Sequence, residues 1–174
     1  MSDQTIMYIF PGQGSQYAGM GSDLCAEFPT ALRVYEQANE VLGYDIQALS
    51  ANGPEEELGL TRHTQPALLV HEIACLEVFK ELTGGSVQAS LAAGHSLGEY
   101  TALVAAGVIS FADGLRLVKK RGELMGEHGE GGMLALGLTV EEATPVADRF
   151  YCQIASCNLP QQTVVGGTNA DLDA

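Results

Sequence analysis

The sequence predicts an α/β fold in two parts, with a parallel sheet in residues 1–130 and a smaller unit in residues 131–174. In the first part, short apolar runs alternate with longer segments of helical periodicity, a pattern typical of a parallel sheet. From Gly131 the order changes to strand, helix, strand, strand, followed by the start of one more helix. A ferredoxin-like unit has the order β-α-β-β-α-β. The second part is therefore expected to be an incomplete ferredoxin-like subdomain.

The first expected strand is the apolar run TIMYIF, residues 5–10, which ends at Pro11. The glycine-rich segment PGQGSQYAGMG follows it and is expected to form a turn that opens into a helix. A helix over residues 28–42 is predicted by apolar residues at helical spacing, and Gly43 marks its end.

The rest of the first part continues the same alternation. The pattern QPALLVHEIACLEVFKEL predicts a second helix, with Pro66 in its first turn, and SVQASLAAG predicts a second buried strand. A third helix is expected over residues 96–106, and Gly107 ends it. The fourth helix is expected over residues 110–129, where Ser110 suits the N-cap.

The second part opens with the expected strand GGMLALGL. The segment TVEEATPVADRF predicts a helix, because Thr139 and Glu142 have the spacing of a capping box. The runs YCQIASCN and QTVVGG predict two strands around the turn NLPQQ, and TNADLDA predicts the first turn of a further helix. On this interpretation one strand of the subdomain is still missing.

The composition indicates a globular protein, with 46% hydrophobic and 17% charged residues. No apolar run is long enough for a membrane span, and the N-terminus lacks the basic region of a secretory signal, so we expect a cytoplasmic protein. The four cysteines lack metal-ligand spacing, so we expect reduced core thiols and no metal site. We also expect no cofactor.

The net charge of −14 argues against general affinity for nucleic acid or for anionic membranes. One local exception is a basic cluster on the expected fourth helix. It consists of Arg116, Lys119, Lys120 and Arg121, half of the eight basic residues. This cluster suits an anionic partner, although an ordinary solvated helix face explains Lys119 and Lys120 equally well.

The segment AAGHSLGEY places Ser96 between the second strand and the third helix, with Gly94 and Gly98 on either side. The pattern G-x-S-x-G at this position is typical of a nucleophile elbow, a turn so tight that flanking side chains would collide. Amides at the start of the following helix can then face an oxyanion. Ser96 and Glu99 also fit a capping box, but an N-cap does not explain either glycine.

A second glycine-rich turn, PGQGSQ, can supply another oxyanion donor, because Gly12 and Gly14 let the backbone near Gln13 approach a ligand closely. A nucleotide site is less well supported, since Tyr17 replaces the third glycine of G-x-G-x-x-G and no P-loop lysine follows. A plain glycine turn is the remaining alternative.

Arg121 is expected on the apolar face of its helix, because Leu117, Val118, Leu124 and Met125 all fall on the same side at helical spacing. An unpaired guanidinium in such a stripe is costly, so it needs a carboxylate or a bound anion. The alternatives are an internal salt bridge, for instance to Glu99, or an aliphatic stem that snorkels to water.

Several motifs together resemble the malonyl-CoA:acyl-carrier-protein transacylases of fatty acid and polyketide synthesis. These are FPGQGSQ, TQPALL, AGHSLGEYTALVAAGVISFADGLRLV and RGELM, in this order and spacing. The resemblance covers essentially the whole chain as the N-terminal portion of the family. It implies an α/β-hydrolase-like core with an inserted ferredoxin-like subdomain, and ping-pong acyl transfer from malonyl-CoA to the phosphopantetheine thiol of acyl carrier protein.

The resemblance also implies roles for individual residues. Ser96 would be the nucleophile that carries the malonyl group, and the amides of Gln13 and Leu97 would form the oxyanion hole. Arg121 would bind the free malonyl carboxylate. The positions of Gln65, Asn158 and His95 match residues that line or adjoin the family's active site.

The chain departs from the family in its general base, which is a histidine in a later block that these residues do not contain. The histidines present are His63, His71, His95 and His128. His95 adjoins the nucleophile, but an elbow turns the neighbouring side chain away. The base is therefore expected from another segment, and a separate C-terminal half of the same enzyme is a candidate partner. Two other functions stay open: a serine hydrolase that cleaves acyl thioesters or esters with water, and an inactive fragment.

Overall fold

The computed structural model describes residues 5–174 of the chain. Its internal contacts divide the chain into two compact units, with the boundary between Glu127 and His128. This boundary lies close to the one expected at residue 130.

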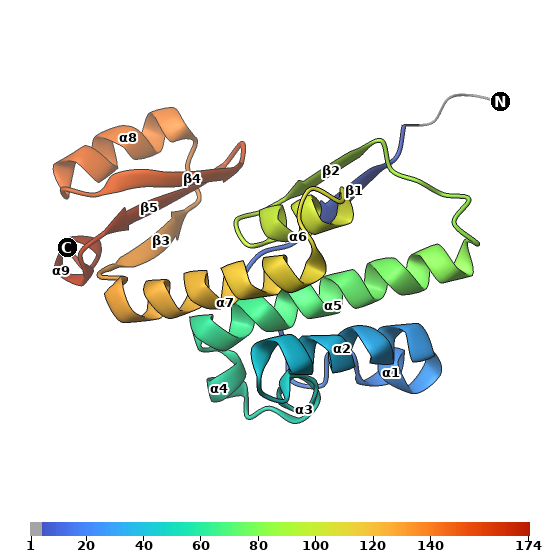
Figure 1. The fold of residues 1–174 in the computed structure, drawn as a ribbon. Coiled ribbons are helices and arrows are strands. Elements are labelled where there is room, and N and C mark those ends of the chain that lie inside the picture. Colours follow the sequence, from blue (N-terminus) through green and yellow to red (C-terminus); the bar gives the residue numbers. More distant parts are fainter. Residues whose placement is uncertain (1–4) are drawn as a thin grey trace. The chain divides into compact units, whose positions relative to one another are not determined.

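The first unit is mostly helical, with two short strands (Figure 1). Its elements, in chain order, are β1 (Met7–Phe10), α1 (Ser22–Glu27), α2 (Pro29–Leu42), α3 (Ile46–Asn52), α4 (Glu55–Leu58), α5 (Thr61–Leu82), β2 (Leu91–Gly94), α6 (Gly98–Ala105) and α7 (Phe111–His128). Helix α5 lies between helices α1–α4 on one side and the β1–β2 sheet with α6 on the other (Figure 1).

Strands β1 and β2 form the parallel sheet that the sequence predicts, with Met7 opposite Leu91 and Phe10 opposite Gly94. The expectation that these strands are buried is wrong, because Ile9 is 74% and Leu91 54% exposed. The second strand was expected over residues 86–94, and this prediction is wrong for residues 86–90. Because β1 has only four residues to pair with, the parallel ladder begins at Leu91. The carboxyl end of β2 leads directly into the segment that carries Ser96.

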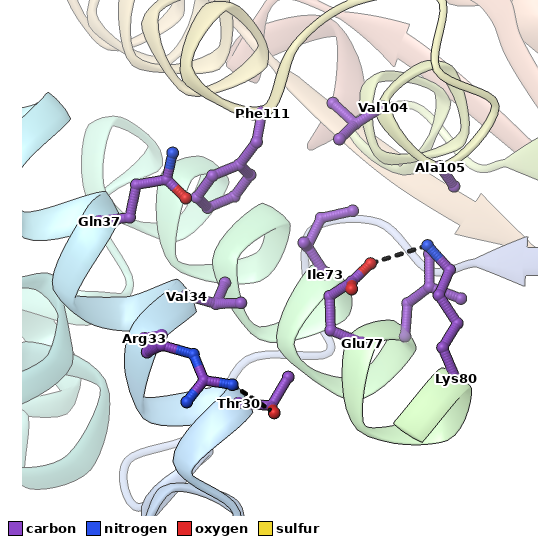
Figure 2. Close-up of a pocket in the computed structure, with 11 residues that line it drawn as sticks. Thr30, Arg33, Val34, Gln37, Ile73, Glu77, Lys80, Val104, Ala105 and Phe111 are labelled. Atoms are coloured by element: carbon purple, nitrogen blue, oxygen red, sulfur yellow. Dashed lines mark hydrogen bonds and ion pairs between the residues drawn. The ribbon is translucent and has the colours of Figure 1, made fainter. Parts of the chain in front are cut away.

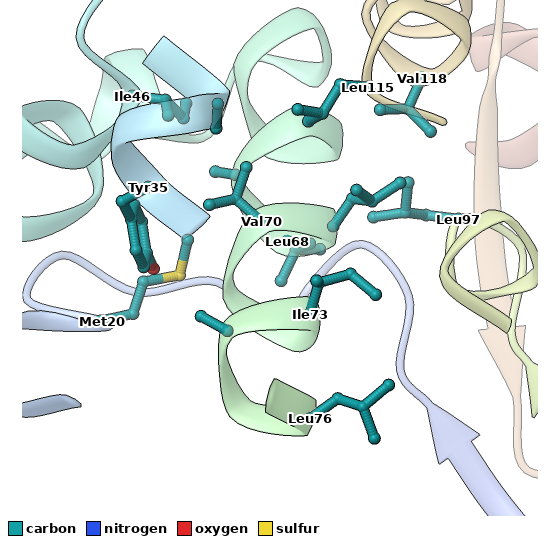
Figure 3. Close-up of a cluster of buried hydrophobic side chains, with 14 of the residues drawn as sticks. Met20, Tyr35, Ile46, Leu68, Val70, Ile73, Leu76, Leu97, Leu115 and Val118 are labelled. Carbon is teal, nitrogen blue, oxygen red and sulfur yellow. The ribbon is translucent and has the colours of Figure 1, made fainter. Parts of the chain in front are cut away.

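The core of the first unit forms around α5, whose buried residues occupy several sides of the helix. Leu68, Val70 and Ile73 on α5 pack among Tyr35 from α2 and Leu97 from the segment before α6 (Figure 3). These side chains are at most 6% exposed. The helix is therefore buried on more than one face, which fixes the elements that hold the candidate site.

The second unit contains β3 (Gly132–Leu136), α8 (Val140–Arg149), β4 (Gln153–Leu159), β5 (Gln162–Gly167) and α9 (Asn169–Leu172). Its antiparallel sheet has the order β3-β5-β4. Strand β5 is antiparallel to both neighbours, so β3 and β4 run parallel with β5 between them. This is the split β-α-β arrangement, and Cys152 and Val165 are among its buried residues.

Two predicted N-caps, at Thr139 and Ser110, are confirmed. Thr139 and Glu142 make the complete capping box at the start of α8. The hydroxyl of Ser110 accepts a hydrogen bond from the amide of Asp113 over 3.1 Å at the start of α7. Helices α3 and α4 were not predicted, although Asp45 caps α3 by accepting from the amide of Ala48.

The expectation of core cysteines is wrong in part. Cys152 is buried and Cys25 is half-buried, but Cys75 and Cys157 are exposed. All four are free thiols. Cys75 lies on α5 with its sulfur 3.6 Å from a ring nitrogen of His71, and Cys157 lies on β4.

Candidate active site

Ser96 lies in a sharp turn between β2 and α6. Its backbone has a φ of 53°, one of two positive values among the non-glycine residues that the structure describes. Such a conformation is strained for an L-residue and persists only where the surroundings enforce it. The residue is exposed, so its hydroxyl is accessible to a substrate.

The two flanking glycines are required by close backbone contacts. A Cβ on Gly94 would lie 1.9 Å from the carbonyl carbon of Gly98, and a Cβ on Gly98 would lie 2.3 Å from the carbonyl oxygen of Phe10. Both distances are far below van der Waals contact. The strand end, the start of α6 and the end of β1 therefore meet with no room for side chains, which is the physical meaning of the glycines in G-x-S-x-G.

The capping-box alternative for Ser96 is wrong. The N-cap of α6 is Leu97, and no side-chain cap is present. The amide of Glu99 donates to the backbone oxygen of Ser96 rather than to its hydroxyl. Because the hydroxyl of Ser96 does not cap the helix, it is available for another contact.

That contact is with Arg121 on α7. Its Nη2 donates a hydrogen bond of 2.9 Å to Oγ of Ser96, and its guanidinium carbon lies 5.7 Å from the centre of the Tyr100 ring. No carboxylate among residues 5–174 lies within 4 Å of Arg121, so the proposed salt bridge to Glu99 is not present. Sequence reasoning missed Tyr100, although it lies four residues after Ser96 in the elbow motif.

The surroundings of Arg121 differ from the expected apolar stripe. Val118 is fully buried, but Leu117, Leu124 and Met125 are 42–49% exposed. The buried line of α7 consists of Gly114, Leu115, Val118 and Gly122. Arg121 therefore lies beside this line rather than within it, and it is half-buried. Its guanidinium keeps several N–H donors available for an anion.

The basic cluster around Arg121 is mostly occupied by internal contacts. Arg116 pairs with Asp113 over 2.9 Å, and Lys120 lies 3.7 Å from Glu123. Lys119 donates to the backbone oxygen of Leu42 over 3.0 Å. The ammonium group of Lys119 therefore joins α7 to the end of α2, and affinity of the cluster for an anionic partner stays a prediction.

The two amides expected in the oxyanion hole belong to Gln13 and Leu97. In the described part of the chain, neither backbone N–H donates to a protein acceptor. The side chain of Gln13 is engaged elsewhere, since its Nε2 donates to Thr61 over 3.3 Å. Leu97 is buried at the start of α6, where helix amides point toward the elbow.

The remaining residues taken from the resemblance lie in different places. Gln65 is fully buried on α5, with its Nε2 3.3 Å from the sulfur of Met125 on α7 and its Oε1 without a partner among the described residues. Asn158 belongs to the second unit, on β4, where its Oδ1 accepts from Ser156 over 2.5 Å.

No histidine of residues 5–174 makes a hydrogen bond to the hydroxyl of Ser96. The ring of His95 lies against Gly12, where a Cβ would be 2.8 Å from its Nδ1. His63 contacts Glu57 over 3.0 Å. His71 contacts the hydroxyl of Tyr35 over 3.2 Å, and burial lowers its pKa.

The first unit also has a cavity of about 470 Å³ between α2, α5 and α6, at the start of α7 (Figure 2). Its charged side chains have partners: Lys80 pairs with Glu77 over 2.7 Å, and Arg33 donates to Thr30 over 2.8 Å. Thr30 in turn donates to Glu81. Of these groups, Lys80 and Glu77 form an ion pair, whereas the partner of Arg33 is a neutral hydroxyl.

No group of three or more His, Cys, Asp or Glu side chains within residues 5–174 is arranged to hold a metal ion. None of the helices that the structure describes is long and apolar enough to cross a membrane.

The chain is similar to known acyltransferases over almost its whole length. The sequence model of the acyl transferase domain family matches residues 7–174. The chain is 46% identical over 172 residues to a malonyl CoA-acyl carrier protein transacylase of Bacillus subtilis, a match covering 94% of this chain and 53% of the relative. It is 44% identical over 172 residues to the polyketide biosynthesis protein PksE of the same species, covering 97% of this chain and 22% of the relative.

Solved structures agree with this similarity. A malonyl CoA-acyl carrier protein transacylase from Coxiella burnetii has a TM-score of 0.93 at 40% identity, covering 98% of this chain and 56% of that one. A type II polyketide acyl-carrier protein in complex with its malonyl-transacylase gives a TM-score of 0.87 at 43% identity, covering 98% of this chain and 57% of that one. The chain thus spans about half the length of the transacylases it matches, and its mixed α/β fold is the fold of those structures. It belongs to the acyl transferase domain family.

Proposed function

We propose that this chain is the part of a malonyl-CoA:acyl-carrier-protein transacylase that holds the acyl group. The observation that carries the proposal is the pair Ser96 and Arg121: an exposed hydroxyl in a strained turn, 2.9 Å from a guanidinium that has no carboxylate partner among the described residues. A nucleophile beside an available cation suits an acyl group with a second, negatively charged end.

The first half-reaction forms an ester at Ser96. Its Oγ attacks the thioester carbonyl of malonyl-CoA and loses its proton to a base, and the CoA thiol leaves with a proton. The amides of Gln13 and Leu97 would donate to the developing oxyanion, since neither has a protein acceptor within residues 5–174. Arg121 would leave the hydroxyl of Ser96 and pair with the malonyl carboxylate.

The second half-reaction transfers the malonyl group to a thiol. The phosphopantetheine thiol of acyl carrier protein attacks the ester carbonyl, and Ser96 regains its proton. The similarity to a malonyl-transacylase in complex with its acyl-carrier protein supports this acceptor. A relative named malonyl CoA-acyl carrier protein transacylase and one named for polyketide biosynthesis match about equally well, so the proposal covers both fatty acid and polyketide synthesis.

The base is the group that the described residues do not supply at Ser96. We propose that the base is a histidine, and that it belongs to the part of the enzyme that corresponds to the unmatched part of the longer relatives.

No metal or cofactor is needed for this chemistry, which is nucleophilic and electrostatic throughout. For the fold, we propose that β1 and β2 belong to an α/β-hydrolase-like core and that the split β-α-β unit is part of a ferredoxin-like subdomain.

The test follows the labelled malonyl group from malonyl-CoA in the full-length protein. We expect the label on the phosphopantetheine of holo acyl carrier protein and, without carrier protein, on Ser96. Release of free malonate with no label on carrier protein would instead establish the serine hydrolase. Ser96→Ala should abolish the labelled intermediate, and its persistence in that variant would overturn the proposal.

A further inference from the structure

The helix that follows the elbow is short and packs against β1, β2 and α5. Helix α6 has eight residues, and its buried positions are Gly98, Thr101 and Ala102. Among the hydrogen bonds of the described residues, one joins an α6 side chain to another element: Oγ1 of Thr101 donates to Oε2 of Glu72 on α5. This bond lies one turn into the helix whose start follows Ser96.

Glu72 is unusual for a buried carboxyl group. It is 7% exposed, and Thr101 is fully buried. No cation among the described residues pairs with Glu72, and its Oε1 is buried without a hydrogen-bond partner. Burying a carboxyl without a cation is costly, and burying an unpaired polar atom adds to the cost. A glutamate at this position therefore reduces stability, which calls for a compensating role.

The bond lies close to the candidate site. Ser96, shortly before α6, has a strained backbone, and its hydroxyl accepts a hydrogen bond from Arg121. The first turn of α6 is held by main-chain contacts at Gly94 and Gly98. The bond from Thr101 to Glu72 fixes the next turn against α5, and α5 is the central helix of the core.

We propose that Glu72 is a positioning residue: through its hydrogen bond with Thr101 it fixes α6 on α5 and thereby holds the hydroxyl of Ser96 in the geometry needed for acyl transfer. The inference rests on the proposed function of Ser96 as the nucleophile. A misplacement of about 1 Å at a reacting group can lower the rate about a hundredfold, so a loosened α6 should affect the chemical step more than substrate binding.

The test compares variants of the full-length protein in malonyl transfer. Thr101→Val and Glu72→Leu remove the bond, and each should lower kcat about tenfold or more with KM changed less than about threefold. Thr101→Ser keeps a hydroxyl and should restore kcat to within about threefold of wild type. The double variant should lose no more than either single variant, because both changes remove the same interaction.

A matched control separates positioning from stability. Thr163 in the second unit is 1% exposed and donates to the backbone oxygen of Leu138 over 3.0 Å, so Thr163→Val removes a comparable buried bond far along the chain from α6. We expect its kcat, normalised to folded protein, to equal that of wild type. If Thr101→Val also keeps wild-type kcat, or if the effects of the two single variants add up, Glu72 has no positioning role.

An activity-independent measurement keeps this inference separate from the proposed function. Hydrogen exchange, followed by mass spectrometry on a peptide covering residues 95–103, should be faster in Thr101→Val and return to the wild-type rate in Thr101→Ser. If the wild-type protein fails to transfer malonyl groups, the proposed function is wrong. The hydrogen-exchange rates alone then decide whether the bond from Thr101 to Glu72 holds α6 in place. Unchanged exchange in Thr101→Val overturns the positioning role.

Discussion

Replacing Glu72 with glutamine should change how the stability of this protein depends on pH. Burial raises the pKa of Glu72 from 4.5 to about 7, and the hydrogen bond from Thr101 opposes the rise only in part. A carboxyl group with a raised pKa binds its proton more tightly in the folded state than in the unfolded state. The stability that the protonated group provides is complete below pH 4.5 and is lost as the pH rises through about 7.

The size of this loss follows from the two pKa values. They differ by about 2.5, and each pH unit corresponds to about 1.4 kcal/mol, so the wild type should lose about 3 kcal/mol across this window. Glu72→Gln cannot ionise and escapes the loss. Its free energy of unfolding, relative to wild type, should therefore rise by about 3 kcal/mol between about pH 4 and about pH 8. Unpaired amide hydrogens of the glutamine add a cost that does not change with pH.

The assay is urea denaturation of both proteins at about pH 4, 6 and 8, with the difference in unfolding free energy plotted against pH. Glu36→Gln on α2 is the matched control, because it makes the same change at an exposed side chain. A flat profile for Glu72→Gln, or one that falls as the pH rises, would refute the claim that Glu72 is buried without a counter-charge.

Three further changes test separate features. Gly98→Ala should lower the free energy of unfolding by about 3 kcal/mol in urea denaturation, because its Cβ would lie 2.3 Å from a β1 carbonyl oxygen. Gly126→Ala on α7, where an added Cβ has nothing within 4 Å, should leave the free energy of unfolding unchanged or raise it. Equal effects of the two changes would contradict the close packing of the elbow. Thr139→Ala should lower the unfolding free energy by about 1 kcal/mol by removing the cap of α8, and an unchanged value would show that the capping box contributes nothing. Cys75 should react with iodoacetamide at neutral pH more slowly than Cys157, although both are exposed, because burial and the nearby Glu72 raise the pKa of the Cys75 thiol; faster reaction at Cys75 would contradict this environment.

The helices and strands that carry strong local signals could be predicted from the sequence. The capping box at Thr139 and the serine at position 110 fix the starts of α8 and α7, and Gly43 ends α2 with a φ of 78°. Elements that depend on a partner were predicted less well. Strand β2 is shorter than its apolar run because β1 pairs with only four of its residues, and pairing length is not encoded locally.

The candidate site shows the same division. Gly94 and Gly98 could be assigned to a tight turn from the sequence, because only contacts with other backbone explain two glycines around a serine. The environment of Arg121 could not be deduced, since helical periodicity places Leu117 and Leu124 on its face but does not say whether anything covers them. The role of Glu72 could not be deduced either, because its partner Thr101 lies 29 residues away and on another helix.

The pairing of Ser96 with Arg121 is a consequence of how α6 and α7 are connected. Val104, near the end of α6, lies against Gly114, near the start of α7, where an added Cβ would be 2.7 Å away. Ser96, just before α6, meets Arg121 farther along α7. The two segments therefore run antiparallel, and the turn at Gly107, with a φ of 71°, returns the chain toward the elbow. At about 3.6 residues per helical turn, one residue inserted within α7 before Arg121 would turn the arginine by about 100° about the helix axis and carry it away from the serine. The position of the arginine along α7 is thus itself a structural requirement of the site.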